Sequence, residues 1–186
     1  MPRPTRIEGF AIVSEDGMLA DADRRIPPAL VVEADQKFFH GSLEHAAVVV
    51  QGRHSHEGGP RADRRYRLVV TRSVPSLAPH PTFPKALLWN PRGASLEQAW
   101  AGLGAPDGVL AVIGGGDVNQ IFLDRGFDVF HLSRVAGVRL PGGRPVFPDV
   151  GPNRTPEDIL AEHGLKPAPQ HVLDPAARAT LVSWQR

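Results

Sequence analysis

The sequence contains no cysteine among its 186 residues, which excludes disulfide bonds and thiol catalysis and restricts any zinc site to histidine and carboxylate ligands. It also lacks long apolar runs. None approaches the roughly 20 residues of a membrane-spanning helix, and the opening MPRPTRIEGF has no signal-peptide core. The formal net charge of +1 gives no argument for nucleic acid or an acidic membrane as partner. We therefore expect a cytoplasmic protein with neither nucleic acid nor membrane as partner.

What is present is the composition of an ordinary folded domain. Hydrophobic residues make up 41% of the chain and charged residues 22%. A chain of this length can bury one ample core, so we expect residues 1–186 to form a single domain. The 19 prolines and 19 glycines separate short elements instead of gathering in a linker, as in many α/β domains.

Short apolar runs alternate with helical patterns along the chain. The predicted strands are residues 9–14, 46–51, 67–71, 87–90, 109–113, 128–135, 171–173 and 180–184, and the predicted helices are residues 33–45, 95–102 and a segment ending near residue 126. This alternation indicates an α/β fold with a doubly wound, mostly parallel sheet and an antiparallel C-terminal strand pair. Ligands of such sheets bind at the carboxyl ends of the strands.

The most informative segment is VLAVIGGGDVNQIFLDRG, residues 109–126. A buried strand runs into three consecutive glycines, Gly114, Gly115 and Gly116, and a helical pattern follows. Glycines let a phosphate approach the backbone, and the N-terminus of a helix favours negative charge. The segment therefore predicts an anion site, with tight strand-to-helix packing and no ligand as the alternative.

Asp35 lies at the start of a predicted helix and is followed by QKFF. One interpretation is an exposed carboxylate, favoured there by the helix dipole. The other places Asp35 in a crevice with Phe38 and Phe39 as apolar walls. Desolvation in such a crevice would raise the pKa of Asp35 towards the range of a general acid.

Two polar clusters follow predicted strands. Arg53, His54 and Ser55 offer donors for a phosphate after the strand at residues 46–51, and a solvated turn is the alternative. His54 and His56 face the same way only in a strand and have no evident third ligand, so we expect no metal site.

The second cluster is Thr71 and Arg72, which end the strand at residues 67–71. An arginine at the carboxyl end of a strand in a nucleotide-binding sheet is placed to hold the 2′-phosphate of an adenosine ribose. A plain solvated strand end is the alternative interpretation.

Taken in order, the chain resembles the dihydrofolate reductase superfamily. The matching stretches are GFAIVSEDG, EADQKFF, VVVQGRHSHE, RLVVTRS, LAVIGGGDVNQIFL, FHLSRV and PVFPDV, spread over about the first 150 residues in the order of the family. The resemblance implies an eight-stranded, mostly parallel sheet flanked by helices. It also implies NADPH as hydride donor for a C=N bond in a pteridine or pyrimidine-derived substrate.

The resemblance also assigns roles to residues on the substrate side. Asp35 matches the carboxylate that grips the pterin and promotes protonation of its imine nitrogen, Ser133 matches the hydroxyl that supports this contact, and Phe39 matches an aromatic neighbour. Arg65 matches the arginine that clamps the glutamate of folate, with Arg64 as the alternative because the spacing differs by one residue.

The same resemblance assigns a cofactor site along the strand ends. Its residues are Ala11, Ile12, Gly52, Arg53, His54, Ser55, Thr71, Arg72, Ile113, Gly114, Gly115, Gly116, Asp117 and Val118. In the family, the first-strand residues lie beside the nicotinamide, the glycine turn holds the pyrophosphate, and the Thr71–Arg72 strand end holds the 2′-phosphate.

Several residues depart from the family pattern. Leu30 replaces a tryptophan five residues before the carboxylate, and Asn119 replaces a tyrosine after the glycine turn. Residues 58–63, GGPRAD, offer almost no apolar wall for a p-aminobenzoyl ring. We therefore expect cofactor binding to be kept and dihydrofolate to be a weak substrate.

The segment SEDGMLAD, residues 14–21, instead resembles the aminopyrimidine reductases of riboflavin biosynthesis, although the D-x-P-x-L-x-x-R pattern of that branch is not evident. It opens a predicted loop over residues 15–30, of the length that often forms a lid or binding loop.

Three functions follow as hypotheses. The first is an NADPH-dependent reductase of dihydrofolate or a related pterin, and the second is a reductase of a ribosylaminopyrimidine in riboflavin biosynthesis. The third is a non-catalytic NADP-binding protein, which would not need a proton-handling group such as Asp35. The edge of an open sheet can pair with a second copy, so both a monomer and a homodimer fit the sequence.

Overall fold

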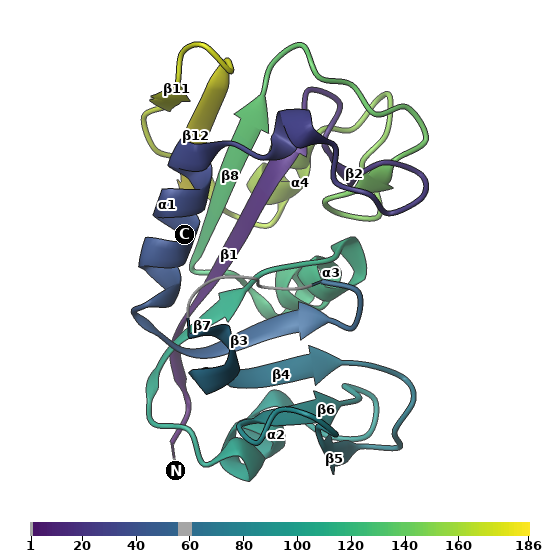
Figure 1. Cartoon of the computed structure of the whole chain (residues 1–186), viewed down its shortest axis with the longest axis vertical. Helices are drawn as coiled ribbons and strands as arrows, with labels where there is room; N and C mark the ends of the chain where they lie inside the picture. The colour runs from purple at the N-terminus through teal and green to yellow at the C-terminus, as the bar shows by residue number, and fades with distance from the viewer. Residues whose placement is uncertain (1, 56–60) are drawn as a thin grey trace.

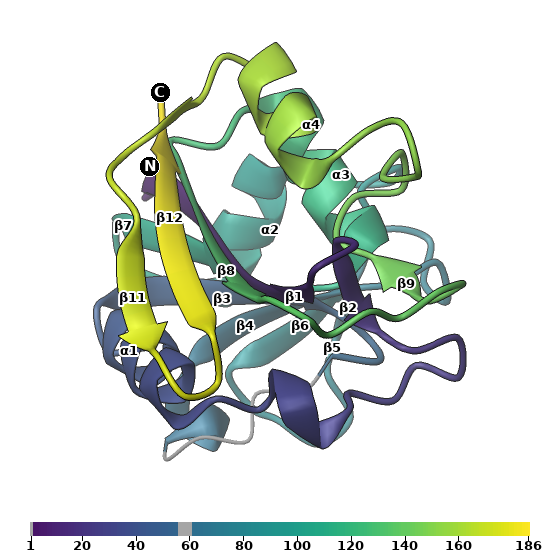
Figure 2. The ribbon, with the colours of Figure 1, turned by 90° about the horizontal axis from the view of Figure 1, so that it is seen from above.

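A computed structural model describes residues 2–55 and 61–186. A large sheet forms its middle layer, with helix α1 on one face and helices α2, α3 and α4 on the other (Figures 1 and 2). The helices are α1 (Glu33–Leu43), α2 (Leu96–Leu103), α3 (Gly116–Arg125) and α4 (Pro156–Glu162), with short 3-10 turns at Pro28–Leu30 and Ala62–Arg64. No helix in these described ranges is long and apolar enough to cross a membrane.

Ten strands among the described residues form the large sheet, in the order β10-β12-β8-β1-β7-β3-β4-β6-β5, with β11 paired to β12. Their bounds are β1 (Pro4–Ser14), β3 (Ala46–Gly52), β4 (Tyr66–Val70), β5 (Leu77–Pro79), β6 (Ala86–Trp89), β7 (Gly108–Val112), β8 (Val129–Val135), β10 (Lys166–Pro167), β11 (His171–Asp174) and β12 (Ala179–Gln185). The strands from β8 to β6 run parallel, whereas β12, β11, β10 and β5 pair antiparallel.

This architecture confirms the predicted α/β fold with a mostly parallel sheet and an antiparallel C-terminal pair. All eight predicted strands are present, and the implied count of eight is exceeded by the short strands β5 and β10. Central parallel strands are buried on both faces and therefore appear as continuous apolar runs. Val48, Val49 and Val50 of β3 illustrate this, since each is at most 1% exposed.

Several predicted boundaries were wrong. Strand β1 begins at Pro4 instead of residue 9, because its polar first half also pairs with the neighbouring strand β7. Helix α1 ends at Leu43 instead of residue 45. Helix α4 was not predicted, although Thr155 forms a capping box with Asp158 and proline follows it at the first helical position, as is common at helix starts.

The predicted irregular loop over residues 15–30 contains strand β2 (Met18–Ala20), which pairs with β9 (Arg144–Pro145), and a 3-10 turn. The Ser14 hydroxyl donates to the Asp16 carboxylate at 2.5 Å, and the Leu140 backbone N–H donates to the same group at 3.0 Å. Although burial opposes ionisation of Asp16, these hydrogen bonds lower its pKa. The ionised carboxylate therefore ties the segment after β1 to the segment before β9.

A candidate active site at the carboxyl ends of the strands

Asp35 lies in the first turn of α1 and is half-buried, not exposed. The Ser133 hydroxyl of β8, which is only 1% exposed, forms a hydrogen bond with the Asp35 carboxylate. Burial raises the pKa of Asp35, and the Ser133 hydrogen bond opposes this rise. The structure thus brings together Asp35 and Ser133, as the sequence predicts, in a partly dehydrated environment.

Packing on both sides of Asp35 fixes the position of α1. Before the helix, Leu30 and Val32 are buried in a cluster with residues of β8 and β12. Along the helix, Phe38 and Phe39 pack against Phe10 of β1, with ring centroids 6.1 and 5.9 Å away. These apolar contacts hold the start of α1 over β8 and β1, where Ser133 lies.

The glycine turn follows β7 and meets the turn after β3. Gly114 and Gly115 have φ angles of +144° and +44°, which residues other than glycine rarely adopt. A Cβ atom on Gly114 would lie 3.0 Å from the Ser55 hydroxyl, and the Gly52 N–H donates to the Gly114 carbonyl at 3.0 Å. The two predicted phosphate segments therefore form one polar surface at the N-terminus of α3.

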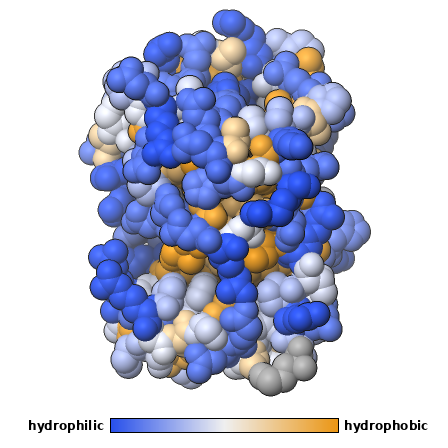
Figure 3. Space-filling model, turned by 180° about the vertical axis from the view of Figure 1, so that it is seen from behind, coloured by the Kyte–Doolittle hydropathy of each residue, from blue (hydrophilic) through white to orange (hydrophobic). Residues whose placement is uncertain are grey.

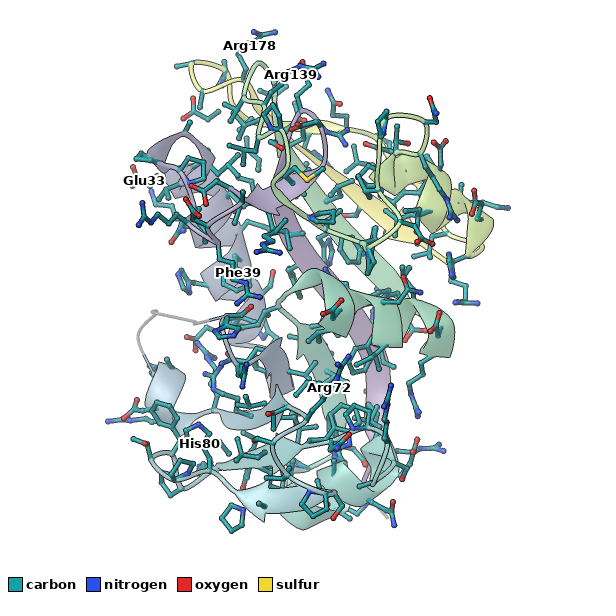
Figure 4. All side chains as sticks on the ribbon, turned by 90° about the vertical axis from the view of Figure 1, so that its right-hand side faces the viewer. Glu33, Phe39, Arg72, His80, Arg139 and Arg178 are labelled. Atoms are coloured by element: carbon teal, nitrogen blue, oxygen red, sulfur yellow. The ribbon has the colours of Figure 1, made fainter. Side chains whose placement is uncertain are left out.

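The next strand places a third polar segment beside that surface. Gly52 of β3 is paired with Val70 of β4, so the residues that follow the two strands leave the sheet side by side. Arg53 and Arg72 are exposed there, whereas Thr71 is buried and bonds the Ser73 hydroxyl at 3.0 Å. The Arg53 guanidinium contacts His54 at 3.2 Å. Figure 4 looks onto this side, with Phe39 above and Arg72 below.

The order of the strands arranges all these residues in a line. Ser133 on β8 is paired with Ile12 on β1, which neighbours Ala11, and then come the turns after β7, β3 and β4. Four strand spacings of roughly 4.8 Å separate β8 from β4, about 19 Å in all. A carboxylate with a raised pKa thus lies at one end of an extended edge, and the glycine turn and the exposed arginines lie towards the other.

The Arg65 side chain is already bonded to other residues of the protein. It donates to the Leu43 carbonyl at 2.8 Å and pairs with Glu44 at 3.4 Å, at the C-terminal end of α1. Arg64 is exposed. Of the predicted segment over residues 58–63, residues 58–60 lie outside the described part, as does His56, and the described remainder carries no large apolar side chain.

The sequence analysis did not predict a buried polar pair that lies beside the turn at residues 62–64. Arg67 of β4 is 5% exposed and donates to the Gln51 side chain at 2.6 Å and to the Ala62 carbonyl at 2.9 Å. The available signal was the presence of glutamine and arginine in otherwise apolar strands. In the described ranges, no group of three or more histidine or carboxylate side chains is arranged to hold a metal ion.

Sequence comparison finds no matching family model and no matching curated protein. Solved structures do match. A protein assigned to riboflavin biosynthesis from Shewanella sp. aligns with a TM-score of 0.65 at 18% identity, covering 98% of this chain and 99% of that one. Dihydrofolate reductase from Enterococcus faecalis, complexed with NADP(H), aligns with a TM-score of 0.60 at 16% identity, covering 97% and 96%.

A third structure is a diaminohydroxyphosphoribosylaminopyrimidine deaminase/5-amino-6-(5-phosphoribosylamino)uracil reductase from Thermotoga maritima. Its TM-score is 0.66 at 17% identity, and the alignment covers 98% of this chain but 56% of that one. These matches confirm the resemblance at the level of the fold. The chain has the fold shared by dihydrofolate reductase and the riboflavin-pathway reductases.

The contact between Ser133 and Asp35 leads to a first prediction. Ser133→Ala removes the hydrogen bond that favours the ionised carboxylate, so the pKa of Asp35 is expected to rise further. The measurement is a titration of the Asp35 carboxyl carbon by NMR. Ser183→Ala is the matched control, because the Ser183 hydroxyl on β12 bonds His131 instead, at 2.8 Å. An unchanged Asp35 titration in Ser133→Ala would contradict this contact.

Proposed function

We propose that this protein is an NADPH-dependent reductase that transfers a hydride to a C=N bond of a pterin or a related aminopyrimidine. The observation that carries the proposal is the edge described above. It combines the half-buried Asp35, whose pKa is raised by burial, with a glycine turn and exposed arginines placed further along the same edge.

The residues present fit a dinucleotide. The backbone of Gly114 and Gly115 and the Ser55 hydroxyl would hold the pyrophosphate at the N-terminus of α3, where unpaired N–H groups favour anions. Arg72 would pair with the 2′-phosphate, and Ala11 and Ile12 of β1 would lie beside the nicotinamide. When bound, NADPH supplies the hydride for the carbon of the C=N bond.

The protein's own part in the chemistry is the proton. Reduction of a C=N bond adds the hydride to carbon and a proton to nitrogen, so the cofactor leaves oxidised and the substrate gains two hydrogens. Asp35 would bind the amino and ring N–H groups of the substrate and promote protonation of the imine nitrogen. Ser133 would orient the Asp35 carboxylate, and the side chains of Phe10, Phe38 and Phe39 would limit the access of water.

A second substrate class is favoured by the residues before β4. The described residues 61–64 are polar or small, with Arg64 exposed and Arg61 paired with Glu44 at 2.9 Å, and they offer little surface for an aromatic ring. A ribosylaminopyrimidine phosphate would meet these side chains better than the p-aminobenzoyl group of folate. Two of the matching structures come from riboflavin-pathway proteins, which supports this alternative. A protein that only binds NADP would not need the contact between Asp35 and Ser133.

The experiment is a comparison of steady-state constants for dihydrofolate, dihydrobiopterin and the ribosylaminopyrimidine intermediate, with NADPH oxidation as the readout. Burying an aromatic ring contributes about 1.5–3 kcal/mol, or roughly 10- to 150-fold in affinity. Without a wall for that ring, we expect KM for dihydrofolate to be no lower than KM for the tail-less pterin. A strong preference for full-length dihydrofolate would show that another segment supplies the wall.

A further inference from the structure

The face of the sheet opposite Asp35 carries a separate pocket. It lies where α4 and the residues after β10 flank strands β8 and β12. Figure 2 shows α4 on this face of the sheet, and Figure 3 views the molecule from behind, the side on which α4 lies. Its volume is about 300 Å³, at the lower end of the range for small-ligand sites. The residues lining it include Leu132, Arg134, Glu157, Ala168, Val182 and Trp184.

Two polar atoms on the residues lining this pocket are buried without a hydrogen-bond partner among the described residues. They are the Nε of Arg134 and the Nε1 of Trp184, both of which can only donate. A buried donor without an acceptor destabilises the folded chain, because it has lost its hydrogen bond to water and gained none in return. The other two tryptophans do not share this defect, since Trp89 donates to the Ala94 carbonyl and Trp100 to the Pro106 carbonyl.

The strand register places the residues that carry these donors at opposite ends of the pocket. Arg134 is paired with Thr180, and Trp184 is paired with Phe130, four residues back along β8. Leu132 and Val182 are paired midway between them. The pocket therefore has an apolar middle, and at each end a lining residue carries one buried, unused N–H.

The charge of the pocket selects against anions. Arg134 forms an ion pair with Glu157 of α4, so its positive charge is already compensated. An anionic ligand would lie close to the Glu157 carboxylate with no uncompensated cation among the lining residues to balance it. Neutral oxygen acceptors, such as carbonyl groups, satisfy both donors without this repulsion.

We propose that this pocket binds a small, elongated, neutral molecule with an apolar body and a carbonyl oxygen near each end. One oxygen accepts from the Trp184 indole N–H and the other from the Arg134 Nε–H. Both donors are screened from water in the structure, so binding requires side chains of the lining residues to move until the oxygens reach the two N–H groups. The pocket is independent of the reductase site, because Leu132 and Arg134 alternate with Ser133 along β8 and face away from Asp35.

The test uses three probes of one shape: 1,4-diacetylbenzene with two neutral acceptors, 4-ethylacetophenone with one, and terephthalate with two carboxylates. The readout is the set of tryptophan indole N–H signals in a ¹⁵N-labelled protein. We expect 1,4-diacetylbenzene to shift the Trp184 signal saturably and to leave those of Trp89 and Trp100 in place. Because one hydrogen bond is worth about fivefold in affinity, 4-ethylacetophenone should bind about fivefold more weakly, and terephthalate more weakly still.

Two variants complete the test. Trp184→Phe removes one donor and keeps the apolar wall, so 1,4-diacetylbenzene, followed by backbone amide shifts of β12, should bind about fivefold more weakly. Ala168→Trp fills the pocket from its half-exposed rim and should abolish binding. The proposal is overturned if the Trp184 signal does not saturate, if terephthalate binds at least as tightly as 1,4-diacetylbenzene, or if Ala168→Trp, shown to be folded by its spectrum, binds unchanged.

Discussion

Asp35→Asn is expected to lower reductase turnover by about 100-fold or more at neutral pH. The amide keeps the volume of the side chain but cannot promote protonation of the substrate. Cofactor binding and the fold should stay unchanged, because the substitution keeps the size of the side chain and the glycine turn lies after β7, away from α1. Turnover with NADPH and the best substrate of the screen measures the effect.

The dependence on pH gives this prediction a second readout. Burial raises the pKa of Asp35, so its carboxyl holds a proton to higher pH than an exposed aspartate does. Turnover of the native chain should therefore fall as the pH rises, and the deficit of Asp35→Asn should shrink at low pH, where the substrate arrives already protonated. Glu33→Gln is the matched control, since this exposed carboxylate lies in the same helical turn (Figure 4). Equal losses of turnover in both variants would contradict the role of Asp35 in protonating the substrate.

Arg72→Ala is expected to weaken the binding of NADPH by roughly 10- to 150-fold and to leave NADH nearly unaffected. The exposed arginine follows β4, where it would form charge-assisted hydrogen bonds to the 2′-phosphate, and these are worth about 1.5–3 kcal/mol. Calorimetric titration of both cofactors measures the difference. Arg3→Ala, at the amino end of β1, is the control for loss of an exposed arginine. Equal losses for NADPH and NADH would contradict the assignment of Arg72.

The parts of the fold that the sequence predicts are those that one local pattern specifies. The runs containing Val48–Val50 and Leu110–Val112 are apolar on both faces because they form central parallel strands. The two-residue strand β10 and three-residue strand β5 have no such pattern, since their pairing with longer neighbours defines them.

The candidate site divides in the same way. The glycine turn is local, so its residues alone indicate an anion site. The raised pKa of Asp35 depends on the packing of α1 against β1 and β8. Because β8 is about 100 residues away from α1 in the sequence, only the structure shows this effect. Arg65 was predicted from its spacing in the sequence, but spacing does not show that its guanidinium donates to the Leu43 carbonyl at the C-terminal end of α1. Its predicted contact with substrate remains a prediction.

The most direct test of the reductase assignment is hydride transfer itself. The purified protein is incubated with NADPH carrying deuterium at the transferable position of the nicotinamide and with the best substrate of the screen, and the product is examined by mass spectrometry and NMR. We predict one deuterium per molecule on the carbon of the reduced C=N bond, with Asp35→Asn forming the same labelled product far more slowly. Tight NADPH binding without any deuterated product from the three substrates would contradict the account and favour a protein that only binds the cofactor.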